Sequence, residues 1–91
     1  MAGQAQLQRW AVRAVRELGG SAHHVEVAKW IWKNHRNDLH EAGDMFYTWQ
    51  YTLRWAGTNL RQIGAFKPAG ECPQGTWRLT KLADEIYPEE E

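Results

Sequence analysis

The chain is poor in the residues on which most small catalytic and metal-binding domains rely. It has one cysteine, Cys72, and one serine, Ser21. A single cysteine excludes an internal disulfide and a multi-cysteine zinc site, and it suits a reducing compartment, so we expect a cytoplasmic protein. Apolar runs are short throughout, and we therefore expect neither a membrane span nor a signal peptide.

No group of residues has the spacing of a catalytic or cofactor site. The soft ligands available to a metal are His23, His24, His35, His40 and Cys72. Their spacing fits no zinc motif, so surface or capping roles are the simpler interpretation. Gly19-Gly20 is too short for a phosphate-binding loop, and Ser21 stands in no nucleophile motif. We expect a non-catalytic domain that binds no metal and no cofactor.

Tryptophan and the distribution of charge are the unusual features of the composition. Six of the 91 residues are tryptophan. Net charge is zero, but residues 1–81 hold all 11 Lys and Arg against six acids, a balance of +5. Residues 82–91 hold five acids and no base, and we interpret them as an acidic tail or the start of a linker after a domain at 1–81. A basic body suggests a polyanionic partner, although a solvated surface with a solubilising tail explains the charges equally well.

Hydrophobic periodicity predicts three helices in the first two thirds of the chain. The first spans residues 4–18, with an apolar stripe that includes Leu7, Ala11, Ala14, Val15 and Leu18, Trp10 at its border and Arg9, Arg13 and Arg16 on the outer face. A short strand at 21–23 leads to a second helix at 24–35. There Trp30 and Trp32 cannot both face the core stripe. Asn37-Asp38 predicts a break with an N-cap, and Gly43-Asp44 predicts the start of the third helix.

The third helix has two faces of different character. Its core stripe is Trp49, Leu53, Ala56, Leu60 and Ile63. The opposite side carries Tyr47, Gln50, Tyr51, Arg54, Thr58 and Arg61. Trp55 lies between the two, and periodicity leaves it undecided.

After Gly64 the pattern changes to that of a β-hairpin. Residues 65–67 form a short extended run, residues 68–75 a loop, and residues 76–80 alternate with Trp77 and Leu79 on one face. Residues 81–87 add a last helical turn or two before Pro88. Three helices followed by a hairpin give an α+β, mostly α, fold class with the order of a winged helix-turn-helix, the hairpin being the wing.

The chain resembles the N-terminal winged-helix domain of Mrr-type restriction endonucleases, which act on modified DNA. The resemblance covers roughly residues 7–80, and the matching positions are Leu18-Gly19-Gly20, Leu53, Trp55-Ala56, Leu60, Gly64 and residues 75–80. It implies the fold, DNA binding, and core positions for Trp55 and Trp77. It also implies that the domain is joined to an effector domain in a longer protein.

The chain departs from the family pattern at two places where DNA would be contacted. Tyr51-Thr52 stands where family members often have Asn-Arg, and the loop at 69–74 is longer. The family's target is therefore not carried over. An Asp followed by Glu-x-Lys at nuclease spacing is missing from these residues.

A winged helix would place the outer face of the third helix against base edges. The candidate recognition-helix contacts are Tyr47, Gln50, Tyr51, Arg54, Thr58 and Arg61, with Arg and Gln suited to guanine and adenine edges and the last two nearer phosphate. The candidate wing and backbone contacts are Lys29, Lys33, Lys67, Gln74, Thr76 and Arg78. For each group an ordinary hydrated surface is the competing interpretation.

The surplus of aromatic residues suggests a narrower hypothesis. A methyl group on N6 of adenine or C5 of cytosine offers apolar surface in the major groove, and covering it gains about 1 kcal/mol. Tyr47, Tyr51, Trp30 and Trp32 are the candidate methyl contacts, with N6-methyladenine ahead of 5-methylcytosine. The alternative function is a winged helix that binds another protein through exposed aromatics.

Overall fold

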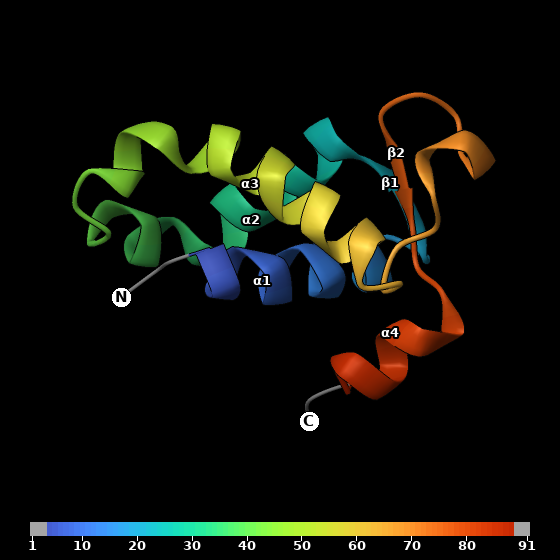
Figure 1. Ribbon diagram of the computed structural model, residues 1–91. Helices are drawn as coiled ribbons and strands as arrows, with labels where there is room; N and C mark the ends of the chain where they lie inside the picture. The colour runs from blue at the N-terminus through green and yellow to red at the C-terminus, as the bar shows by residue number, and fades with distance from the viewer. Residues whose placement is uncertain (1–3, 89–91) are drawn as a thin grey trace.

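The computed structural model describes residues 4–88, which form a mostly helical α+β domain (Figure 1). In chain order the elements are α1 (Gln4–Glu17), β1 (Ser21–His23), α2 (His24–His40), α3 (Met45–Gln62), the 3-10 helix η1 (Ala69–Glu71), β2 (Thr76–Arg78) and α4 (Lys81–Ile86). This is the predicted fold class. The last three residues of the predicted acidic tail, 89–91, lie outside the described residues.

Helices α1, α2 and α3 pack together around one core. The predicted α1 stripe is buried except at its end, where Leu18 is 41% exposed because α1 stops at Glu17. Gly19 and Gly20 follow with φ of 102° and 94°, which turn the chain away. Two further α1 side chains, Trp10 and Val12, are buried as well, so the apolar face of α1 is wider than predicted.

Helix α2 is longer than predicted and changes direction at one residue. The expected end at His35 and break at Asn37-Asp38 are replaced by a kink at His35 itself (φ −130°, ψ 25°), after which the helix continues to His40. The His35 ring stacks on Trp10 of α1, with centroids 4.1 Å apart and planes within 9°. This stack gives the irregular residue a fixed place against α1.

The tryptophans of α2 pack on two different neighbours. Trp32 stacks on Trp49 of α3 at 6.2 Å with planes within 7°, whereas Trp30 lies 5.7 Å from His35. Both are half-buried and pack against the core. Trp30 and Trp32 thus have different aromatic neighbours but share the core, and together with buried Trp10, Trp49 and Trp77 they place five of the six tryptophans in packing roles.

The sheet pairs two segments that are far apart in the sequence. Strand β1 runs antiparallel to β2, with Ala22 opposite Trp77. The predicted strand at 65–67 is reduced to a single bridge between Phe66 and Leu79. The N–H groups of Ala65 and Phe66 are not available for strand pairing. Both donate to the Leu60 carbonyl (2.9 and 3.1 Å) and so cap the C-terminal end of α3. The region where the sequence predicts a wing is therefore formed by β1, β2 and this bridge.

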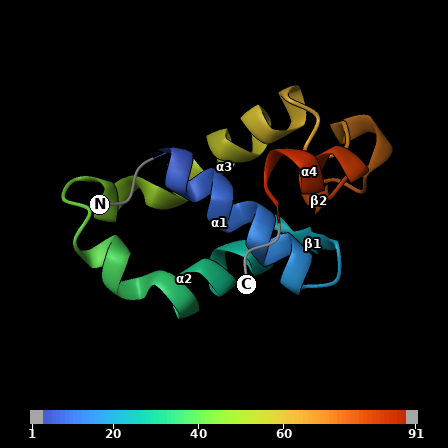
Figure 2. The same cartoon turned by 90° about the horizontal axis from the view of Figure 1, so that it is seen from below.

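Helix α4 folds back onto α1 (Figure 2). Arg16 of α1 donates to the Asp84 carboxylate (3.1 Å) and to the Tyr87 carbonyl (2.8 Å), and the Tyr87 hydroxyl donates to Gln8 (3.0 Å). Arg16 is thus half-buried, whereas Arg9 and Arg13 are exposed as predicted. Within residues 4–88, no helix has the length and apolar character needed to cross a membrane.

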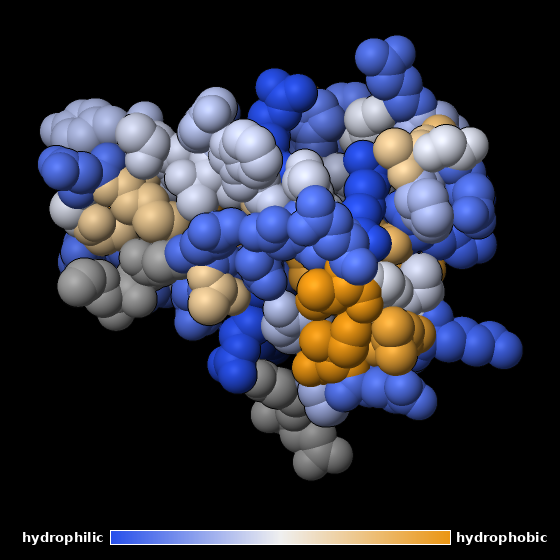
Figure 3. Space-filling model, viewed as in Figure 1, coloured by the Kyte–Doolittle hydropathy of each residue, from blue (hydrophilic) through white to orange (hydrophobic). Residues whose placement is uncertain are grey.

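Ile63 was predicted to extend the α3 core stripe, and that prediction is wrong. Its side chain is 45% exposed, because α3 ends at Gln62 and the chain turns there. Leu82 and Ile86 of α4 are exposed as well. Figure 3 shows an apolar patch where the end of α3 meets α4. The predicted core positions Trp49, Leu53, Ala56 and Leu60 are all buried.

Candidate nucleic-acid interface

The outer face of α3 projects a continuous row of exposed side chains. We call this surface the α3 face; it consists of Tyr47, Gln50, Tyr51, Arg54, Trp55 and Thr58, all exposed. Tyr47 and Tyr51 are 83% and 66% exposed. Among the described residues, the side chains of Tyr47, Gln50, Tyr51 and Arg54 take part in no hydrogen bond or ion pair. Their donors and aromatic surfaces are free to meet a partner.

Trp55 belongs to this face, although the resemblance implied a core position for it. Its side chain is 52% exposed, and its ring lies edge-on to Tyr51 with centroids 6.4 Å apart. Trp55 follows Tyr47 and Tyr51 at steps of four, so the three aromatics form one stripe along the helix. That spacing was a signal in the sequence. A shallow hollow lined by Tyr51, Arg54, Trp55 and Thr58 lies at its centre.

The start of α2 adds a histidine pair beside the α3 face. The His23 side chain caps α2 by accepting from the Val25 N–H (3.2 Å), and its ring stacks on His24 at 4.4 Å. Partial burial, then His23, then the Arg54 guanidinium lower the pKa of His24 below its usual 6.5. Arg54 is therefore close enough to His24 to disfavour its protonation. From the sequence, surface or capping roles were expected for these histidines, and their position beside Arg54 was not predicted.

Arg61 does not point outward with the other predicted α3 contacts. Its guanidinium is half-buried and donates to the Thr76 carbonyl of β2 (2.9 Å), which ties α3 to the sheet. The Nε of the same group is buried without a hydrogen-bond partner in the described residues. The prediction of a phosphate contact at Arg61 is therefore replaced by a structural role.

The wing residues divide in a similar way. Arg78 is exposed on β2, as the buried Trp77 beside it predicts, and its Nε donates to Ser21 Oγ (3.3 Å). Gln74 is exposed in the loop, whereas Thr76 and Lys67 are half-buried. The Lys67 backbone N–H donates to the Arg78 carbonyl (2.9 Å) and closes the wing. Of the predicted wing residues, Arg78 and Gln74 therefore have the exposed side chains.

The predicted contacts on α2 are two lysines and two tryptophans, and none of them belongs to the α3 face. Lys29 and Lys33 are exposed, and Lys29 pairs with Glu26 at 3.4 Å. Trp30 and Trp32, the other candidate methyl contacts, are occupied by the aromatic packing described above. Only Tyr47 and Tyr51 of that group offer a largely free ring.

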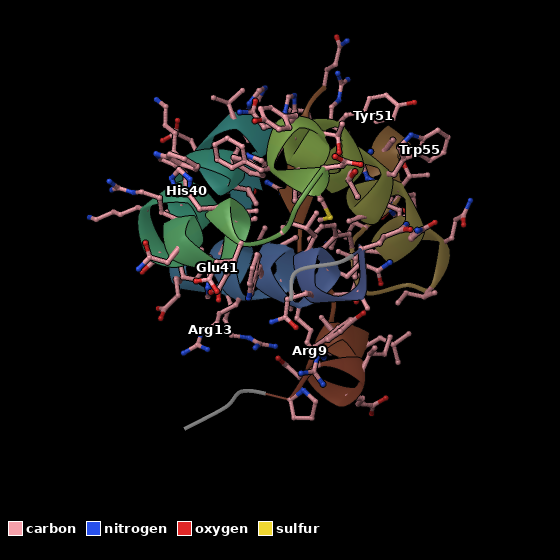
Figure 4. All side chains as sticks on the ribbon, turned by 90° about the vertical axis from the view of Figure 1, so that its left-hand side faces the viewer. Arg9, Arg13, His40, Glu41, Tyr51 and Trp55 are labelled. Atoms are coloured by element: carbon pink, nitrogen blue, oxygen red, sulfur yellow. The ribbon has the colours of Figure 1, made fainter. Side chains whose placement is uncertain are left out.

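A second set of cations lies on the other side of the molecule. Figure 4 shows Arg9 and Arg13 projecting from α1 on the side opposite Tyr51 and Trp55. The excess positive charge of residues 1–81 is therefore shared between two faces. Within residues 4–88, no group of three or more His, Cys, Asp or Glu side chains is arranged to hold a metal ion.

Comparison of the chain with protein-family models, curated proteins and solved structures finds no match. Its function must be inferred from the chemistry of its own surface. On the α3 face that chemistry is a stripe of aromatic rings flanked by an arginine and an amide, beside a histidine whose pKa is lowered. Such a surface covers apolar groups and donates hydrogen bonds to paired acceptors.

Proposed function

We propose that this domain is a winged helix-turn-helix that binds double-stranded DNA. Helix α3 would enter the major groove, and the edge formed by β1, β2 and the loop before β2 would serve as the wing. In this proposal the domain is a non-catalytic reader, and any reaction belongs to an effector domain of a longer protein. The resemblance to the reader domains of Mrr-type enzymes points the same way.

The observation that carries the proposal is the exposed α3 face. The opposite side of α3 is buried, so the helix is held rigidly with its polar and aromatic side outward. Gln50 and Arg54, one turn apart, have the side chains that pair with adenine and guanine edges. A helix face presented only to water has no need of two exposed tyrosines and a tryptophan.

Phosphate contacts would come from the residues around this face. Arg78 and Gln74 of the wing and, after protonation, His24 lie on segments that adjoin α3 or its sheet. Such contacts fix register and supply most of the affinity, which falls steeply as salt is raised. Specificity would come from the α3 face alone.

Modified-base recognition is the finer form of the proposal. A methyl group on N6 of adenine, or less favourably on C5 of cytosine, would be covered by the exposed ring of Tyr47 or Tyr51. The expected gain is about 1 kcal/mol for each methyl, or about a fivefold preference.

Titration with short duplexes tests the proposal. We would measure the affinity of unmodified, N6-methyladenine and C5-methylated duplexes by fluorescence anisotropy at about 0.05 and about 0.2 M salt. Arg54→Ala should weaken binding to all three by about tenfold or more. Arg13→Ala, an exposed arginine on the opposite side of the molecule, is the matched control and should change little. Absence of binding at the lower salt would refute the DNA function.

The aromatic stripe also favours one competing function. Tyr47, Tyr51 and Trp55 at four-residue steps would suit the groove of a partner protein, with aromatic anchors supplying the energy. Those anchors lie on α3, whereas Trp30 and Trp32 are half-buried and pack against the core. Binding to a protein partner would depend on Trp55 and hardly on salt, whereas DNA binding depends on Arg54 and strongly on salt.

A further inference from the structure

Helix α1 and the end of α4 enclose a groove that the α3 face does not use. It has a volume of about 170 Å³, and its lining includes Arg9, Arg13, Trp10, Tyr87 and Pro88. The apolar part of the lining comes from Trp10, Val12, Ile86, Tyr87 and Pro88, and the polar part is three arginines, Gln6 and one acid, Glu17. A groove of this composition suits an extended segment that carries several carboxylates.

Two of the arginines form no ion pair within residues 4–88. Within residues 4–88 the ion pairs are Arg16–Asp84, Lys29–Glu26 and His35–Asp38, so neither Arg9 nor Arg13 has a carboxylate within 4.0 Å. Both are exposed, and they lie four residues apart on the same face of α1. Like charges at this spacing disfavour the helix by a few tenths of a kcal/mol. A negatively charged ligand would remove that repulsion.

The chain itself delivers such a ligand to the groove. Pro88 lines the groove, and residues 89–91, which follow it in the sequence, are three consecutive glutamates. Tyr87 is held against α1 by the Arg16 and Gln8 hydrogen bonds, so the chain is held beside the groove up to this residue. Three extended residues reach about 10 Å, and Arg9 and Arg13 are about 6 Å apart along the helix.

We propose that residues 89–91 bind across Arg9 and Arg13 and form a second docking site on this domain, separate from the α3 face. A tether this short gives an effective concentration in the millimolar range, which favours the chain's own carboxylates over those of another molecule. The bound segment neutralises the arginines on the α1 side. DNA is then attracted to the α3 side alone.

Nuclear magnetic resonance of the arginine side chains tests this site without DNA. We would compare the Nε–Hε resonances of Arg9 and Arg13 in the wild-type domain and in a variant with Glu89→Gln, Glu90→Gln and Glu91→Gln. The expected result is a shift of both resonances and of nearby α1 amides. Raising salt to about 1 M, where the Debye length is about 3 Å, should abolish the difference. The wild-type salt series alone gives the same readout if the variant folds poorly.

The matched control is the lysine pair of α2, which has the same spacing and is also exposed. Amides around Lys29 and Lys33 should not change between the two proteins. Unchanged Arg9 and Arg13 resonances, or equal changes around Lys29 and Lys33, would overturn the proposal. Shifts that depend on protein concentration would assign the carboxylates to a second molecule, and the proposal would again fail.

Added DNA separates this inference from the proposed function. A short duplex should shift resonances of the α3 face and leave Arg9 and Arg13 in place in the wild-type protein. A duplex that moves Arg9 and Arg13 as strongly in the wild type as in the glutamine variant would make the groove a phosphate site and refute the proposal. Failure of the duplex to bind anywhere would refute the DNA function and leave the docking result standing.

Discussion

Gly57 is a residue of α3 whose backbone lies directly against the ring of Trp77. A Cβ placed there would overlap the ring of Trp77, which is itself buried in the core. The absence of a side chain therefore allows β2 to pack directly on α3. Nothing in the spacing of apolar residues marks this glycine as special, because its role depends on a residue twenty positions later.

Gly57→Ala should destabilise the domain by about 1–3 kcal/mol, because overpacking outweighs the helix propensity that alanine gains. Urea unfolding followed by tryptophan fluorescence measures the difference. Gly70→Ala is the control, since a Cβ there meets nothing within 4 Å, and it should change stability by less than about 0.5 kcal/mol. Equal stability of the two variants would contradict the close packing of Trp77 on α3.

The two arginines of α3 should separate binding from stability. Arg61→Ala removes the hydrogen bond to the Thr76 carbonyl and should cost about 1–2 kcal/mol of unfolding free energy. Arg54 is exposed and makes no such bond, so Arg54→Ala should leave stability nearly unchanged while weakening DNA binding. Unfolding and anisotropy measured on both variants check this. A large loss of stability for Arg54→Ala would show that its side chain supports the fold.

At the scale of elements, α3 combines a buried stripe with an exposed one. Trp49 lies on the buried stripe and Trp55 on the exposed stripe. Trp49→Ala should cost about 3–5 kcal/mol, since it empties the core and removes the stack on Trp32. Trp55→Ala should change stability by about 0.5 kcal/mol or less, because half of that ring already faces water. Thermal unfolding of both variants measures the difference. A similar loss of stability in the two variants would show that Trp55 is packed in the core.

The order of the elements could largely be predicted from the sequence, and their ends could not. Periodicity placed three helices and the buried strand residue Trp77 correctly. It missed the continuation of α2 through His35, because the stack on Trp10 that holds the kinked residue is a contact between helices. It also predicted a full strand at 65–67, whose N–H groups instead cap α3.

For the whole molecule, the His24 site predicts a pH dependence of stability. Burial, His23 and Arg54 lower the pKa of folded His24 below the value of 6.5 expected when unfolded. The unfolded chain therefore binds the proton more readily, so the stabilising contribution is complete above pH 6.5 and is lost as pH falls below it. Urea midpoints above and below pH 6.5 should differ more for the wild type than for His24→Gln. Identical pH profiles would contradict the assignment.

DNA binding should have the opposite pH response. Phosphate near His24 favours its charged form, so affinity should rise as pH falls below 6.5 even while the free domain loses stability. Anisotropy titrations across that range measure the effect. His24→Gln is again the control, and its affinity should vary less with pH.

The sequence alone determined the fold class, the two-sided character of α3, and the polar residues from which the candidate site was chosen. Helical periodicity suffices for these, because the apolar stripe of a helix must face the core. Tertiary structure alone decided that Arg61 turns inward to β2, that Trp55 lies outward beside Tyr51, and that His24 adjoins Arg54. It also separated the arginines of α1 from the α3 face. Each of these depends on contacts between residues distant in the chain, and a local pattern does not encode them.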